Sequence, residues 1–163
     1  MLDYALKRLY RKPQTKDKCV QVFAGYHDSE EWQRISDVYT GRESYPYVAF
    51  PGVSPDKYYA SYAFADICVV PLVATEFNGH KSPLKILEAA NMGLPVVVSQ
   101  VNPYLGFDGA VLYANNNQEW YLHLRALVND EEMRREYGKR LLQFCDKYYN
   151  FETINKKRYD LVS

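Results

Sequence analysis

Short apolar segments alternate with amphipathic segments along this chain, and that alternation is the feature that most restricts its fold. Five apolar segments have the length of β-strands: CVQVFAG, YPYVAFPG, DICVVPL, LPVVVS and AVLYA. Several of them are apolar on both faces, as are strands in a sheet that helices cover on each side. Strands that alternate with helices are typical of parallel sheets. The sequence therefore predicts an α/β fold with a parallel, doubly wound sheet of about five strands and right-handed connections.

Helical periodicity and capping residues place the helices between and after these strands. Ser54 has the character of an N-cap, with Pro55 in the first helical position. The predicted helices are residues 3–12, 29–39, 54–65 and 82–92, two helices capped by Asn117 and Asp130, and a short helix within 151–163. A chain of 163 residues without repeats or long linkers fits one domain, residues 1–163.

Composition excludes several classes of partner. The 20 basic and 20 acidic residues give a net charge of zero, which gives no reason to expect nucleic acid or a membrane surface as partner. No apolar stretch reaches the roughly 20 residues of a membrane span, and no signal peptide is visible. The wide spacing of Cys19, Cys68 and Cys145 indicates reduced, mostly buried thiols in a cytoplasmic protein.

Familiar catalytic and metal-binding patterns are missing from the sequence. It has no Ser–His–Asp set, phosphate-binding P-loop, GxGxxG fingerprint or CxxC pair. His27 and His123 have no partner at metal-ligand spacing, so we interpret both as structural. The aromatic pair Tyr58–Tyr59 is interpreted as packing. A ligand site must therefore come from the loops at the carboxyl ends of the strands, which are residues 25–29, 51–55, 72–82 and 99–109.

The loop after the third strand leads into the most informative block, FNGHKSPLKILEAANMGLPVVVS. Ser82 is the best N-cap for the helix that follows, and Pro83 fits its first position. Gly93 supplies the left-handed residue that ends the helix before the next strand. Leu84, Leu87 and Ala90 share one face of this helix, which we predict packs on the sheet.

The start of this helix has the properties of an anion site. Free N–H groups at Ser82–Lys85 would lie at the carboxyl end of a strand. Lys81 and Lys85 oppose the helix dipole, so an anion that neutralises them is a reasonable inference. Glu88, one to two turns further on, could accept hydrogen bonds from hydroxyls, and a diphosphate with a ribose would fit this arrangement. The residues alone favour this interpretation no more than an exposed Lys85–Glu88 surface pair.

A family resemblance favours the anion-site interpretation. KSPLKILEAANMGLPVVVS resembles the donor-binding motif of the retaining GT-B glycosyltransferases of family four, in which a glutamate and a second glutamate enclose seven residues and Gly-x-Pro and an apolar strand follow. VAFPGVSPDKYYASYAFADICVVPL resembles the preceding part of that domain, and DGAVLYANNNQEWYLHLRALVNDEEMRREYGKRLLQF resembles its closing strand and two helices. The start, ALKRLYRKPQTKDKCVQVFAG, resembles its early helix-to-strand passage.

The resemblance implies one Rossmann-like half of a GT-B fold and assigns roles to single residues. Glu88 matches the second glutamate, which would hold the ribose hydroxyls of a nucleotide sugar. His80 stands where the first glutamate is usual and would contact the transferred sugar, although Glu76 or Asn78 could substitute. The implied donor-binding set is Gly52, Val53, Asn78, Lys81, Ser82, Pro83, Leu84, Lys85 and Glu88, where Gly52 and Val53 would present backbone groups to the base.

The resulting hypothesis is the donor-binding domain of a glycosyltransferase that moves a hexose-type sugar from a nucleoside diphosphate to an acceptor. No metal or other cofactor is expected, because the helix terminus and lysines would neutralise the diphosphate. The resemblance covers only the C-terminal half of such an enzyme, so we expect no acceptor domain and no transfer by this chain alone. We also expect a homo-oligomer or a separate acceptor-binding half as partner.

Two other readings of the sequence remain open. The first is a noncatalytic Rossmann-like module that binds nucleotides or partner proteins and descends from such a domain. The second and weaker one is a receiver-like signalling domain, although the acidic cluster and lysine expected at its strand ends are not evident.

Overall fold

The computed structural model describes residues 2–40 and 45–162, and it has a mixed α/β architecture. The strands are β1 (Gln21–Tyr26), β2 (Tyr47–Pro51), β3 (Cys68–Val70), β4 (Val96–Ser99) and β5 (Leu112–Ala114). The helices are α1 (Leu2–Arg11), α2 (Glu30–Thr40), α3 (Glu76–Gly79), α4 (Leu84–Asn91), α5 (Asn117–Asn129), α6 (Glu131–Tyr148) and α7 (Phe151–Val162), with 3₁₀ helices η1 (Pro55–Phe64) and η2 (Asn102–Tyr104). Each of the five predicted strands is therefore present, and parallel sheets flanked by helices confirm the predicted fold class.

The strands form two parallel sheets rather than one continuous sheet. β1 pairs with β2, and Gln21 lies opposite Tyr47 in the register. β4 lies between β3 and β5, with Val97 opposite Val69 and Leu112. Among the described residues, no ladder joins β1 to β3, so the sheet predicted from the sequence is divided between its second and third strands.

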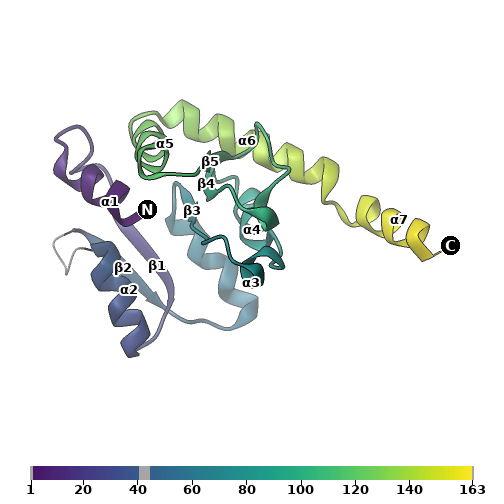
Figure 1. Ribbon diagram of the computed structural model, residues 1–163, viewed down its shortest axis with the longest axis horizontal. Coiled ribbons are helices and arrows are strands. Elements are labelled where there is room, and N and C mark those ends of the chain that lie inside the picture. The colour runs from purple at the N-terminus through teal and green to yellow at the C-terminus, as the bar shows by residue number, and fades with distance from the viewer. Residues whose placement is uncertain (1, 41–44, 163) are drawn as a thin grey trace.

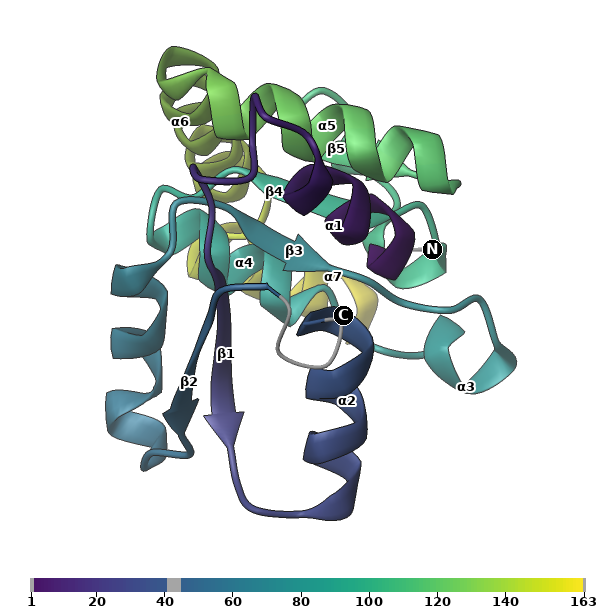
Figure 2. The same ribbon diagram turned by 90° about the vertical axis from the view of Figure 1, so that its left-hand side faces the viewer.

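β4 divides the interior into two hydrophobic cores, because successive side chains of a strand point to opposite faces. Val96 and Val98 belong to a core built with α4 and α6, which includes Ile86 and Leu141. Val97 belongs to a second core, built with α1 and α5, which includes Leu2, Ala5, Trp120 and Leu124. Figure 2 shows α1 and α5 on one side of the β3–β4–β5 sheet and α4 on the other. The continuous apolar run LPVVVS is explained by this cover on both faces.

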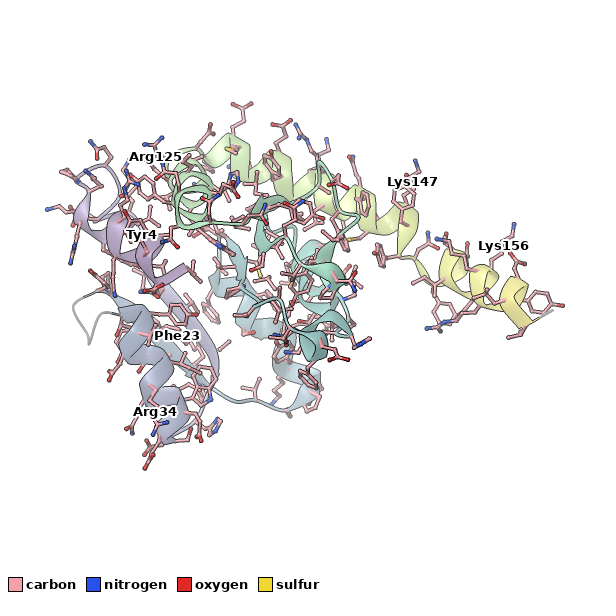
Figure 3. The ribbon with its side chains drawn as sticks, in the orientation of Figure 1. Tyr4, Phe23, Arg34, Arg125, Lys147 and Lys156 are labelled. Carbon is pink, nitrogen blue, oxygen red and sulfur yellow. The ribbon has the colours of Figure 1, made fainter. Side chains whose placement is uncertain are left out.

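Two helices at the chain ends differ in how they pack. α1 buries Leu2, Ala5, Leu9 and Tyr10 and lies against α5. α7 has no buried residue and projects from the end of α6 away from the rest of the molecule (Figure 1). Figure 3 shows Lys156 on this projecting helix. None of the helices within the described residues is long and apolar enough to cross a membrane.

Two of the four predicted N-caps, Ser54 and Asp130, occupy the N-cap position, although the side chain of Ser54 makes no capping bond. Asp130 caps α6, because its carboxylate accepts a hydrogen bond from the N–H of Met133 at 2.8 Å. The cap of α5 was predicted one residue too late: the side chain of Asn116, rather than that of Asn117, accepts from the N–H groups of Gln118 and Glu119. Asn116 and Asn117 are chemically alike, so the sequence could not distinguish them.

Candidate functional site

The segment between β3 and β4 begins with a loop that several hydrogen bonds hold in place. Ser99, which is buried at the end of β4, accepts a bond from the N–H of Leu72 through its hydroxyl at 2.9 Å. Asn78 donates from its amide to the carbonyl of Val73 at 2.8 Å, and Asn102 donates to the carbonyl of Gly79 at 3.1 Å. The loop that precedes α4 therefore has a defined path over the carboxyl ends of β3 and β4.

Part of this loop forms a short helix that was not predicted from the sequence. Thr75 caps the one-turn helix α3 by accepting from the N–H of Asn78 at 3.1 Å. His80, which the resemblance assigns to the transferred sugar, ends that turn and is exposed. Asn78 is half-buried and bonded within the loop.

α4 begins one residue later than predicted. Pro83 occupies the N-cap position rather than the first helical position, and the side chain of Ser82 makes no capping bond. A proline ring has no N–H to lose, so it is tolerated at either place. The N–H groups of Leu84 and Lys85 find no acceptor among the described residues. The predicted free donors are therefore present at Leu84 and Lys85, whereas Pro83 supplies none.

The buried face of α4 includes Ala90, as predicted, but is otherwise shifted from the predicted one. Ile86, Ala89 and Ala90 are fully buried, while Leu84 is 52% exposed and Leu87 is only half-buried. The helix is rotated relative to the prediction, so Glu88, next to Ala89, also turns inward. Gly93 follows with a positive φ of 67°, as predicted for the residue that ends this helix.

Glu88 is the central residue of the site. The residue is 6% exposed, and its carboxylate atom Oε2 accepts a hydrogen bond from the Lys85 ammonium at 3.0 Å. The Tyr62 hydroxyl donates to the same oxygen at 2.7 Å. A carboxylate is costly to bury without such partners. The alternative of an exposed, solvated Lys85–Glu88 pair is therefore wrong for Glu88.

Tyr58 and Tyr62, both on η1, complete the cluster. The Tyr58 hydroxyl accepts a hydrogen bond from Lys85, and the Lys85 nitrogen lies 4.4 Å from the centre of the Tyr58 ring. The Tyr58 and Tyr62 rings meet edge to face at 6.1 Å. Interpreting Tyr58 as mere packing was therefore incomplete, and Tyr62 was missed. Their spacing of four residues, in a helix after the carboxyl end of β2, is the signal that could have identified them.

The protonation of the cluster follows from its environment. Burial and the hydrogen bond to Glu88 raise the pKa of Tyr62 well above its usual value, so this phenol remains a donor. Burial alone would lower the pKa of Lys85, but hydrogen bonds to Tyr58 and Glu88 outweigh it and raise that pKa. Burial also raises the pKa of the nearby Cys68 thiol to about 12. At neutral pH Tyr62 is thus a neutral phenol and Lys85 a cation, so both act as donors in the cluster.

The other predicted residues lie around this cluster at the surface. Lys81 and Ser82 are exposed beside the start of α4, and the Lys81 nitrogen lies 5.4 Å from the centre of the Phe77 ring. Gly52 and Val53 follow β2, and the N–H of Gly52 donates to the carbonyl of Tyr26 at 3.1 Å. Both are exposed, and within the described ranges no hydrogen bond connects either of them to α4.

Metal-ligating side chains do not gather anywhere in the described part of the chain: no group of three or more His, Cys, Asp or Glu residues is close enough to hold an ion. His123 bonds to the carbonyl of Tyr113 at 2.9 Å, and His27 packs on Trp32. These contacts fit the structural roles predicted for both histidines.

Comparison with protein families matches residues 1–130 of the 163-residue chain to a family described as Glycosyl transferases group 1. The matched range contains every strand and the Tyr58–Tyr62–Lys85–Glu88 cluster, and it ends at the junction of α5 and α6. No curated protein and no solved structure matches the chain.

Proposed function

The chain belongs to the group 1 glycosyltransferases, and we propose that its part in glycosyl transfer is to bind the nucleoside diphosphate of a sugar donor. In this proposal it is the C-terminal, donor-binding half of a retaining enzyme of family four that transfers a hexose-type sugar. The acceptor substrate would bind to a separate half of the catalytic cleft.

One observation carries the proposal, namely the buried carboxylate of Glu88 beside the start of α4. Both of its hydrogen bonds go to Oε2, so Oε1 has no donor among the described residues. No buried side-chain oxygen among the described residues lacks a hydrogen-bond partner, so the unbonded Oε1 is accessible at the surface of this otherwise buried residue. An accessible carboxylate oxygen with remaining acceptor capacity is suited to a neighbouring pair of hydroxyls, such as those of a ribose.

The start of α4 supplies the complementary positive potential. The free N–H groups of Leu84 and Lys85 and the positive end of the helix dipole favour an anion there. Lys81 and Lys85 add two cations within the same short segment. We propose that these groups, with Ser82, bind the diphosphate and stabilise it as a leaving group without a metal ion.

The ends of the donor are assigned from the positions of the remaining residues. Gly52 and Val53 lie exposed at the carboxyl end of β2, where backbone groups can pair with the edge of a base. His80 and Asn78, which precede Lys81 in the segment between β3 and α4, would contact the sugar.

A noncatalytic nucleotide-binding module is the second candidate function. It is favoured by His80, which stands where the resembling enzymes carry a glutamate. Donor hydrolysis or transfer, assayed with the chain and a supplied acceptor-binding half, separates a transferase from such a module.

Calorimetric titration with UDP and GDP tests donor binding. Changing Glu88 to Ala should weaken binding of the preferred nucleotide by about 1.5–3 kcal/mol, the range for hydrogen bonds to a charged group. Glu136→Ala is the matched control, because Glu136 also pairs with a cation along its helix, Arg140, but is exposed on α6. Equal affinity of Glu88→Ala and the parent chain would contradict the proposal.

A further inference from the structure

The orientation of Glu88 depends on a residue from another element. Its two donors, Tyr62 at 2.7 Å and Lys85 at 3.0 Å, both bond to Oε2. Lys85 lies on α4 one turn before Glu88, whereas Tyr62 lies on η1, 26 residues earlier in the chain. Tyr62 therefore fixes the carboxylate from outside its own helix.

The geometry also restricts Lys85, which could otherwise swing away from Glu88. The Lys85 ammonium lies over the ring of Tyr58 and donates to its hydroxyl. The Tyr58 ring is in turn held edge to face by Tyr62. η1 thus supplies one residue to each charged side chain, Tyr58 to Lys85 and Tyr62 to Glu88. Within the described ranges, these contacts leave Oε1 of Glu88 without a donor.

We propose that Tyr62 is a positioning residue for nucleotide recognition: by holding Oε2, it directs Oε1 of Glu88 toward the ribose hydroxyls of the donor. This inference rests on the proposed function and adds to it a specific role for η1. It requires that Tyr62 affects recognition of the ribose and leaves recognition of the diphosphate unchanged.

Removing one hydroxyl from Tyr62 and two from the ligand tests this role. UDP and GDP are each titrated beside their 2′,3′-dideoxy counterparts, against the parent chain, Tyr62→Phe and Tyr59→Phe. Tyr59 is the control because it lies on η1, is 46% exposed and, among the aromatic rings of the described residues, contacts only that of Tyr58. We expect Tyr62→Phe to weaken ribonucleotide binding about tenfold. Dideoxynucleotide binding should stay within about twofold, and Tyr59→Phe should change neither.

A second measurement separates action through Glu88 from a general structural role. In a Glu88→Gln background, the Tyr62→Phe change should lower the ribose preference by less than about twofold, because the carboxylate on which it acts is gone. Far-UV circular dichroism and urea unfolding establish that each variant is folded.

Each remaining outcome has a defined meaning. Absence of nucleotide binding by the parent chain would overturn the proposed function and this inference together. A parent chain that prefers ribonucleotides, with the same preference in Tyr62→Phe, would overturn the inference alone. An equal loss for both ligand types, or a variant that does not fold, would show that Tyr62 supports the structure instead, and would likewise overturn it.

Discussion

The two sheets of this protein are both built from largely apolar strands but differ sharply in burial. In the β3–β5 sheet, Val96, Val97 and Val98 are fully inaccessible and Ser99 is 4% exposed. In the β1–β2 sheet no residue is buried, and Val22 and Val48 are 37% and 44% exposed. Neither hydrophobic core contains a residue of β1 or β2. Figure 3 labels Phe23 on β1 and Arg34 on α2 in this outer part of the molecule.

The difference arises from neighbours rather than from composition. β4 has a strand on each side and helices on both faces, whereas β1 has one strand partner within the described residues. A two-stranded sheet buries little apolar surface by itself. Most of the folding free energy is therefore expected to come from the β3–β5 part, which also holds α4 and Glu88.

The largest expected difference in stability between these two parts concerns two glycines. Gly138 of α6 faces the end of α4, and a methyl group there would lie 1.9 Å from the carbonyl oxygen of Gly93. Gly138→Ala should lower the free energy of unfolding by about 3 kcal/mol, because backbone must move to relieve the overlap. Gly52→Ala, which meets no atom within 4 Å beside the outer sheet, should change it by less than about 0.5 kcal/mol. Urea denaturation measures both values.

Alanine is otherwise the better helix former, which makes the Gly138 result informative. In an open helix position the same change would stabilise by about 0.5–1 kcal/mol. A Gly138→Ala protein at least as stable as the parent would show that α6 does not pack closely on the end of α4. The comparison between the two parts would then need revision.

The sequence predicted the order of elements well because strands and caps depend on local signals. The run LPVVVS and the caps Asp130 and Gly93 were each identified correctly. The division into two sheets was not predicted, because pairing is decided by neighbours distant in the chain. CVQVF and YPYVAF have the composition of interior strands, yet they lie in the exposed sheet.

The candidate site shows the same limit. Lys85 and Glu88 could be paired from their spacing of three along one helix, and the structure contains that pair. Burial of Glu88 and its bond to Tyr62 could not be predicted, because they depend on the rotation of α4 and on how η1 packs. Ser99, which holds the loop after β3, was missed for the same reason.

The reactivity of the cysteine thiols is expected to differ between the two parts by an intermediate amount. Burial raises the pKa of Cys68 on β3 to about 12. Burial also raises the pKa of Cys19, just before β1, but a hydrogen bond with Tyr10 partly offsets that increase. Iodoacetamide at pH 9 should modify Cys68 at least about a hundredfold more slowly in the folded chain than in urea, because the thiolate reacts. Cys19 should show weaker protection, measured by peptide mass spectrometry.

The same shift predicts a pH dependence of stability. The unfolded Cys68 thiol loses its proton near its ordinary pKa of 9.0, whereas the folded thiol keeps it until about pH 12. Stability should therefore fall as pH rises through this interval, by at most about 1.4 kcal/mol per unit for this group. Cys68→Ala should reduce the slope more than Cys19→Ala does. If both variants had the same slope of stability against pH, or if Cys68 were alkylated rapidly in the folded chain, β3 would be as exposed to solvent as β1.

A substitution at the edge of β1 is expected to change stability least, but to change association of the chain clearly. α1 packs on α5, and α7 has no buried residue, so among the described residues neither terminal helix covers or pairs with this edge. An unpaired edge with exposed valines favours pairing with another chain. We therefore predict a dimer or larger oligomer by light scattering at high protein concentration. Val22→Lys should shift it toward the monomer while changing stability by less than about 0.5 kcal/mol.

Val38→Lys is the matched control for this edge. Val38 is 51% exposed on α2, so the change adds the same charge near the same sheet without placing it on β1. If association runs through the edge, Val38→Lys should keep the mass of the parent chain. Equal dissociation by both variants would indicate an interface on the helical face, and a parent chain that is strictly monomeric would show that the exposed sheet is stable in water without a partner. That last result would also reduce the contrast between the two parts to burial alone, because the open edge of β1 would then carry no binding function.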